Sequence, residues 1–269
     1  MSGPIERRHY EDEAFWEFFS GASESEKKRV KTVLETIPTD AYSLLDVGCG
    51  NGLLTNQFSQ KLVVGTDRSI TALKFVRTPK SMSEITSLPF ANQSFDAVVS
   101  TEVLEHLSYQ DFPVALQELS RVARKYIIIT VPYEERREAS FSRCPNCGIT
   151  FHPSYHIRSF YRSSFEDLFL GTPFKLRSLN GIFPVKRPPK WIDQLFLFYF
   201  RITQKNLHLA QSSLCPQCGY KMERKKGLAT NIEESQLGKI KKLINQKQAY
   251  QWWLAVFDAS TTNPTTPKG

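Results

Sequence analysis

The 269-residue sequence lacks long apolar runs. None approaches the roughly 20 residues that a membrane-spanning helix needs. The first residues, MSGPIERRHYEDEAF, carry charges where a secretory signal requires an apolar stretch. We therefore expect a cytoplasmic protein with one main domain and an insertion.

Cysteine is also scarce, since the chain has five. Four of them form two Cys-Pro-x-Cys-Gly units, at 144–148 and 215–219, and Cys49 stands alone. This usage argues against a disulfide framework and favours metal ligation by the paired cysteines.

Most of the chain lacks an excess of Lys and Arg, although the net charge is +8. Residues 181–250 contain 13 Lys and Arg against 4 Asp and Glu, so this segment carries +9 and the remainder about −1. Local basic character of this kind fits a solvated surface or a docking patch for one acidic partner, rather than a nucleic-acid coat.

Short, continuously apolar runs indicate buried parallel strands. They are YSLLDVG (42–48), KLVVGTD (61–67), SFDAVVS (94–100) and KYIIITV (125–131). The segments 52–60, 69–77 and 109–123 between them have helical patterns, and so has 10–37, which Pro38 ends. Alternating strands and helices predict an α/β fold with a doubly wound, mostly parallel, seven-stranded sheet and a zinc-bound insertion subdomain.

Irregular segments interrupt this alternation after residue 131, before a helix (163–171), a strand (174–183) and a last strand (250–259) resume it. We expect an N-terminal helical segment at 1–40 and a disordered tail at 259–269. The Rossmann-like core then comprises 41–135, 155–183 and 249–258, and the zinc-clipped insertions, a lid or substrate region, comprise 136–154 and 184–248.

A glycine-rich turn, LLDVGCGNG at 44–52, follows the first strand. Gly48 and Gly50 allow a sharp turn and close approach to a ligand, and a following helix would direct its free amides at that ligand. The glycines alone are equally compatible with a tight turn in an unrelated α/β protein.

Two acidic residues favour a nucleoside cofactor at this turn. Asp67 ends the next strand, where a carboxylate can accept both hydroxyl protons of a ribose. Asp46 would repel a dinucleotide pyrophosphate, but it can help to hold the ammonium group of a methionine. S-adenosylmethionine is therefore favoured over a dinucleotide.

The stretch DVGCGNG resembles the first motif of class I S-adenosylmethionine-dependent methyltransferases, of the small-molecule and glycan type. SLPFANQSFDAVVSTEVLEHL at 87–107 is similar to later motifs of that family. The resemblance implies cofactor contacts from Asp46, Gly48, Cys49, Gly50, Asp67, Arg68, Glu84, Ile85, Thr101 and Glu102. Glu84 stands where the family usually has Asp, and Cys49 is expected to be a small residue packed under the loop.

The four paired cysteines, Cys144, Cys147, Cys215 and Cys218, predict a closed tetrahedral zinc site with a structural role. Redox dithiols or chance turns are the alternatives. Because 67 residues separate Cys147 from Cys215, the ion should clip two insertions together near the substrate side of the cofactor.

Methyl transfer to a hydroxyl requires alignment of the acceptor and removal of its proton. His156 is the preferred candidate for the general base, and His106 is a second candidate that could instead orient local backbone. A purely structural role remains open for both.

The run LFLFYF at 195–200, with Trp191, Asn206 and His208 nearby, is unusually aromatic. It is compatible with a buried packing helix, a lid, a dimer face or a peripheral membrane contact. The oligomeric state stays open.

The leading hypothesis is O-methylation of a small molecule, sugar or glycolipid, with nitrogen as a less favoured acceptor. The zinc site and the basic insertion keep an RNA methyltransferase as an alternative. A non-catalytic, cofactor-binding or scaffolding protein is the third.

Overall fold

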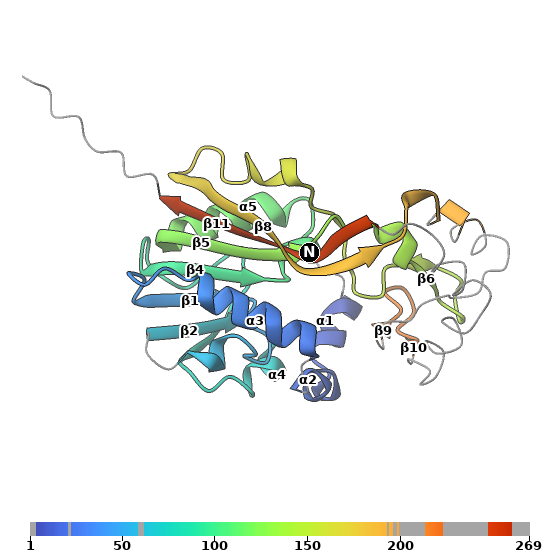
Figure 1. Cartoon of the computed structure of the whole chain (residues 1–269). Helices are drawn as coiled ribbons and strands as arrows, with labels where there is room; N and C mark the ends of the chain where they lie inside the picture. Colours follow the sequence, from blue (N-terminus) through green and yellow to red (C-terminus); the bar gives the residue numbers. More distant parts are fainter. Residues whose placement is uncertain are drawn as a thin grey trace, which may run out of the picture.

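A computed structural model of the chain describes residues 4–20, 23–58, 62–192, 194–195, 198, 213–222 and 247–259. Seven strands form one sheet in the order β3-β2-β1-β4-β5-β11-β8. All neighbours are parallel except β11, which runs antiparallel to both β5 and β8 (Figure 1). The strands are β1 Ser43–Val47, β2 Leu62–Asp67, β3 Lys80–Met82, β4 Phe95–Thr101, β5 Ala123–Pro132, β8 Phe174–Arg187 and β11 Lys247–Ala259. This confirms the predicted fold class.

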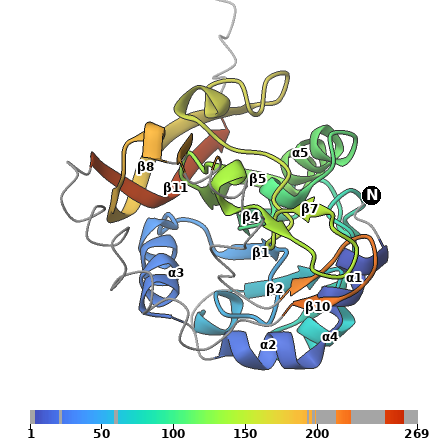
Figure 2. The ribbon, with the colours of Figure 1, turned by 90° about the vertical axis from the view of Figure 1, so that its right-hand side faces the viewer.

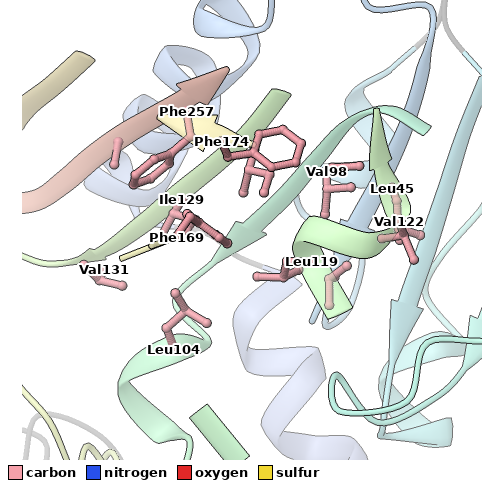
Figure 3. Packing of buried hydrophobic residues seen from close by; sticks show 14 of the residues in the cluster. Leu45, Val98, Leu104, Leu119, Val122, Ile129, Val131, Phe169, Phe174 and Phe257 are labelled. Carbon is pink, nitrogen blue, oxygen red and sulfur yellow. The ribbon is translucent and has the colours of Figure 1, made fainter. Parts of the chain in front are cut away.

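Alternate residues of the central strands face two separate hydrophobic cores, as the two-residue period of a strand requires. On β5, Ile127 and Ile129 belong to the core under helix α5 (Asp111–Val122), whereas Ile128 belongs to the core under helix α3 (Glu24–Thr36). Figure 1 shows α3 and α5 on opposite faces of the sheet, and Figure 3 shows the packing in the α5 core. Both faces are thus covered, which explains why these strands are apolar throughout.

The N-terminal region forms three helices, so the prediction of one helical stretch over residues 10–37 was wrong in its continuity. They are α1 Pro4–Tyr10, α2 Glu13–Ser20 and α3. Helix α3 begins with a capping box, in which the backbone amide of Glu26 donates to Ser23 Oγ and the amide of Ser23 donates to Glu26 Oε2. The Ser-x-x-Glu spacing in the sequence already contained this start signal.

One other predicted helix is shorter than expected, and two are not α-helical. The described part of 52–60 contains the 3₁₀ turn Thr55–Gln57. Residues 69–77 contain α4 (Ile70–Leu73), and residues 163–171 contain the 3₁₀ helix Arg162–Phe165. In the two 3₁₀ segments the amides bond three residues back, as Gln57 does to Leu54 and Leu168 does to Phe165, so these segments form tight turns in place of α-helices.

The two cysteine-containing segments form small hairpins beside the sheet. β6 (Ser142–Arg143) pairs with β7 (Thr150–Phe151), and β9 (Ser213–Leu214) pairs with β10 (Lys221–Met222). Figures 1 and 2 place them on the side toward which the parallel strands point, next to α1.

Strands β8 and β11 pair along their lengths, from Arg187 opposite Lys247 to Phe174 opposite Ala259. Both strands therefore extend beyond the core boundaries expected from the sequence. Most of the expected second insertion, and the tail after Ala259, lie outside the described residues. Asn206 and His208 lie there too. Trp191, Leu195 and Phe198 are described and exposed. No helix among the described residues is long and apolar enough to cross a membrane.

Candidate active site

A cavity of about 710 Å³ lies at the carboxyl ends of β1, β2 and β4. The order of strands reverses between β1 and β4, which is where doubly wound sheets bind their ligands. Helices α1 and α2 close one side through Tyr10 and Trp16. The cavity brings together all the cofactor-binding and catalytic residues predicted from the sequence: Asp46, Gly48, Cys49, Gly50, Asp67, Arg68, Glu84, Ile85, Thr101, Glu102, His106 and His156.

The turn after β1 depends on two glycines in the left-handed region, with φ of +74° at Gly48 and +53° at Gly50. A Cβ at Gly48 would lie 2.3 Å from Cγ2 of Val103, and one at Gly50 would lie 2.9 Å from the ring of Trp16. The loop is therefore restricted to glycine by backbone conformation and by space.

The expectation that a following helix aims free amides at a ligand was wrong. Only a single 3₁₀ turn follows the loop. The amides of Gly48 and Cys49 donate to the carbonyl of Thr66, and the amide of Gly50 donates to Asp67 Oδ2 at 2.8 Å. Binding at this loop therefore has to rely on carboxylates and shape more than on a helix dipole.

Asp46 is 2% exposed and has one carboxylate oxygen, Oδ1, without a hydrogen-bond partner among the described residues. Its other oxygen accepts a hydrogen bond from the hydroxyl of Thr55. Burial raises the pKa of Asp46 to about 6. A buried, partly unsatisfied carboxylate at a cavity wall fits an incoming ammonium group.

Asp67 receives hydrogen bonds from the amides of Gly50 and Ser69, each at 2.8 Å. Burial raises its pKa, although these bonds oppose the shift. The two bonds fix the carboxylate at the cavity wall, where its remaining lone pairs can accept hydroxyl protons.

Three other predicted cofactor residues, Glu84, Arg68 and Cys49, have different surroundings within the cavity lining. Glu84 is half-exposed and lies 3.4 Å from Arg7, and Arg68 lies 5.3 Å from the ring centre of Tyr10. Cys49 is buried beside Leu73 and Val76. Burial raises the pKa of its thiol strongly, which fits the expected packing role.

Glu102, directly after β4, occupies the left-handed region with φ of +57°, a strained conformation for a residue other than glycine. Its carboxylate accepts hydrogen bonds from the indole of Trp252 at 2.8 Å and from the hydroxyl of Thr130 at 3.2 Å, and it lies 3.5 Å from Arg29. Burial raises the pKa of Glu102. Neither Arg29 nor Trp252 was singled out from the sequence.

His156 lies at the cavity wall with Nδ1 at 2.6 Å from Oε2 of Glu135. Its ring packs edge-on against His106 at 4.8 Å and stacks on His152 at 4.7 Å. Burial raises the pKa of Glu135, but hydrogen bonds from His152 and His156 outweigh that effect and bring it to about 2. An ionised Glu135 therefore orients His156.

Glu105 adjoins this histidine group and was not predicted as a site residue. Its side chain is fully buried, and neither carboxylate oxygen has a hydrogen-bond partner among the described residues. Burial raises the pKa of Glu105 well above its ordinary value. The stretch Glu102-Val-Leu-Glu105-His106 held the signal, since two acids and a histidine follow a strand end within five residues.

The two hairpins bring the four cysteines together, as predicted, with all four sulfur atoms within 4.8 Å of one another. Cys144 Sγ lies 3.6 Å from Cys218 Sγ, and Cys147 Sγ lies 3.5 Å from Cys215 Sγ. None forms a disulfide. A tetrahedral ion with bonds of about 2.3 Å would separate its sulfur ligands by about 3.8 Å, so the set fits a tetrathiolate centre.

The doubly wound sheet and the glycine turn after β1 resemble those of class I, Rossmann-type S-adenosylmethionine-dependent methyltransferase domains. Consistently, residues 45–129 match the family model of the methyltransferase domain. This segment contains most of β1, all of β2 and β4, and most of the residues that line the cavity.

Relatives in sequence belong to several groups. Over 149 residues, 53% of this chain and 63% of the relative, the chain is 29% identical to an uncharacterised protein of Methanocaldococcus jannaschii. It is 29% identical over 128 residues to the tRNA (carboxymethyluridine(34)-5-O)-methyltransferase of Arabidopsis thaliana, covering 45% of this chain and 31% of that protein. It is 33% identical over 95 residues to malonyl-(acyl-carrier protein) O-methyltransferase 1 of Coxiella burnetii, covering 34% and 33%. The matches span less than two thirds of each relative.

Solved structures share the fold at low identity. A chain from the Haloferax volcanii complex of the Trm112 methyltransferase activator with a methyltransferase aligns with a TM-score of 0.54 and 14% identity, covering 93% of this chain and 96% of that one. A S-adenosylmethionine-dependent methyltransferase of Thermotoga maritima aligns with a TM-score of 0.54 and 13% identity, covering 95% and 98%.

Proposed function

We propose that this protein transfers the methyl group of S-adenosylmethionine to an oxygen atom, on a small molecule, a sugar or a glycolipid. The observation that carries the proposal is the cavity at the β1/β4 reversal, which combines the unsatisfied oxygen of Asp46 with the fixed carboxylate of Asp67. Oxygen is preferred as the acceptor because relatives from three groups carry O-methyltransferase in their names.

In this proposal Asp46 and Asp67 bind different parts of the cofactor. Asp46 Oδ1 holds the methionine ammonium, Asp67 accepts the ribose hydroxyls, and Glu84 and Ile85 contact the adenine. When bound, the cofactor supplies an electrophilic methyl group on a sulfonium. Cys49 and the two glycines shape the wall between the carboxylates.

His156 is the proposed general base. Glu135 holds its Nδ1 at 2.6 Å, which leaves Nε2 as the nitrogen that can take the acceptor proton. An acceptor oxygen then forms its bond to the methyl carbon while the carbon–sulfur electron pair stays on sulfur, and the hydroxyl proton goes to Nε2. His106 packs against the base and keeps its ring in place.

The four-cysteine centre is proposed to hold structural zinc that fixes the first hairpin beside the cavity. Tyr155 connects it to the site, since its hydroxyl donates to the carbonyl of Leu214 at 2.8 Å and accepts from the amide of Leu214 at 3.0 Å. Ser154 and His156, on either side of Tyr155, line the cavity. The insertion thus forms part of the substrate wall.

RNA is the second candidate acceptor, favoured by the named activity of the tRNA methyltransferase relatives. Incubation with radiolabelled S-adenosylmethionine separates the two, with small hydroxylated acceptors in one set and total tRNA in the other. Label in tRNA alone would replace the small-molecule proposal.

Cofactor binding is tested by calorimetry with S-adenosylhomocysteine. We expect one site in the wild type and at least tenfold weaker binding in Asp67→Ala, about 1.4 kcal/mol, the scale of one charge-assisted hydrogen bond. Glu138→Ala, a surface change outside the cavity lining, is the control and should bind as the wild type does. Unchanged affinity in Asp67→Ala would remove the ribose assignment.

A further inference from the structure

Two side chains that line the cavity, His106 and His156, form a compact group of metal-ligand type with the buried Glu105. Glu105, His106 and His156 each offer one nitrogen or oxygen atom, and these atoms lie within 4.8 Å of one another. Two come from the turn after β4, and His156 comes from the segment that follows the first cysteine hairpin. The group is separate from the four cysteines, which offer only sulfur.

Unsatisfied polar atoms show that this group lacks a partner. Glu105 is 0% exposed, and neither of its oxygens nor Nδ1 of His106 has a hydrogen-bond partner among the described residues. A buried carboxylate without donors costs several kcal/mol if ionised. Protonation does not resolve this, because the added proton would also need an acceptor. A bound cation would satisfy both residues at once.

Glu135 orients the third ligand. It holds Nδ1 of His156 at 2.6 Å and lies 3.4 Å from Nε2 of His152. A carboxylate on one ring nitrogen of a histidine fixes the tautomer and leaves the other nitrogen basic, as in carboxylate–histidine–metal arrangements. Glu135 and His152 are thus positioning residues.

We infer that Glu105, His106 and His156 bind one divalent metal ion at the wall of the methyl-acceptor pocket. Imidazole together with carboxylate suits first-row divalent ions, and three protein ligands leave open positions. His106 and His156 line the cavity, so those positions face the acceptor.

This inference rests on the proposed methyl transfer to oxygen, but it replaces the general base of that proposal by a metal ion. A hydroxyl bound to the ion is more acidic than a free one and loses its proton to water in the cavity. The resulting oxygen forms the bond to the methyl carbon as the carbon–sulfur pair returns to sulfur. His156 then acts as a metal ligand in place of the base. The acceptor class is a hydroxyl that can coordinate a cation.

Mn²⁺ is the probe, because this ion prefers oxygen ligands, whereas the four cysteines favour zinc. Binding is followed on the full chain by electron paramagnetic resonance of free Mn²⁺. We expect one saturable site in the wild type, and at least tenfold weaker binding in Glu105→Gln and His156→Gln. Glu134→Gln is the matched control from the loop of Glu135 and should bind as the wild type does.

Calorimetry with S-adenosylhomocysteine on the same preparations reports folding of the cavity and keeps the two proposals apart. A wild type that binds S-adenosylhomocysteine but no Mn²⁺ overturns the metal site and leaves the proposed function standing. Full Mn²⁺ affinity in a folded Glu105→Gln also overturns it. Saturable Mn²⁺ binding without S-adenosylhomocysteine binding supports the metal site and contradicts the proposed function.

Discussion

Several buried polar atoms at or beside the candidate active site have no hydrogen-bond partner in the part of the chain that the structure describes. Asp46 Oδ1, both oxygens of Glu105 and Nδ1 of His106 are examples. Leaving such a group unsatisfied costs about 1–3 kcal/mol, and more when the group is charged. Because these unsatisfied groups gather at one edge of the sheet, we infer that a bound ligand satisfies them there.

If Asp46 holds the ammonium group as proposed, cofactor binding should depend on pH. Its pKa of about 6 in the free protein means that ionisation, which an ammonium ligand requires, is lost as the pH falls below 6. We expect the affinity for S-adenosylhomocysteine to fall about tenfold between pH 7 and pH 5, as titrating calorimetry can measure.

Asp46→Asn is the control for that titration. Its affinity should be low at pH 7 and nearly flat down to pH 5, because the titrating group is gone. The linkage to folding has the opposite sign: since burial raises this pKa from 3.8, Asp46 lowers native stability as the pH rises from about 4 to 6. An equal pH slope in wild type and Asp46→Asn would assign the effect to another group.

At the scale of elements, Asp96 joins the beginnings of three strands. It accepts hydrogen bonds from the amides of Tyr42 and Ser43 at 3.0 and 3.2 Å, and from Arg124 at 2.7 Å. Burial alone would raise the pKa of Asp96, but these bonds outweigh it and hold the pKa well below 3.8. β1, β4 and β5 are thereby tied at the edge opposite the cavity.

Asp96→Asn should lower the free energy of unfolding by about 1.5–3 kcal/mol at pH 7, because the amide cannot replace a charged acceptor. Urea denaturation measures this. Because the pKa is depressed, the contribution of Asp96 is present above pH 3.8 and is lost as the pH falls further, so wild type and variant should converge in acid. Asp40→Asn, an exposed partner of Lys125, should change stability by less than about 0.5 kcal/mol. Equal losses in both variants would contradict the role of Asp96.

A second prediction at this scale concerns the zinc content of the two cysteine hairpins. Elemental analysis of Cys215→Ser should show about one zinc fewer per chain than the wild type, with the circular dichroism of the main sheet retained. Cys49→Ser removes the remaining cysteine and should keep the zinc. Stoichiometric sulfur-bound zinc in a Cys144/Cys215 double variant would refute a shared site.

Strands were easier to predict than helices here, for physical reasons. The strands at 42–48, 61–67, 94–100 and 125–131 are apolar because both faces of the sheet are covered, and each was found within one or two residues. β3 was missed as a segment because its three residues are polar or exposed at the sheet edge. Residues 163–171 contain apolar residues at helical spacing, but Phe165 and Phe169 are buried equally well by consecutive 3₁₀ turns.

At the scale of the whole molecule, the cavity gathers residues that the sequence places far apart. That Asp46, Asp67 and the glycine turn lie at one cavity could be predicted, because the acids follow strand ends in recognisable motifs. Glu135 could not, because it meets His156 only through the packing of the first insertion against the sheet edge. Tyr10 and Trp16 reach the cavity through α1 and α2, whose position the sequence does not reveal.

A crystal structure of the protein with S-adenosylhomocysteine tests the central claim most directly. The account predicts the amino group beside Asp46 Oδ1, the ribose hydroxyls on Asp67, and the sulfur facing His106 and His156. The four cysteines should surround an ion that does not touch the ligand, since a saturated tetrathiolate shell has no open position. A ligand bound elsewhere, or a cavity that stays empty at saturating ligand, would contradict the account.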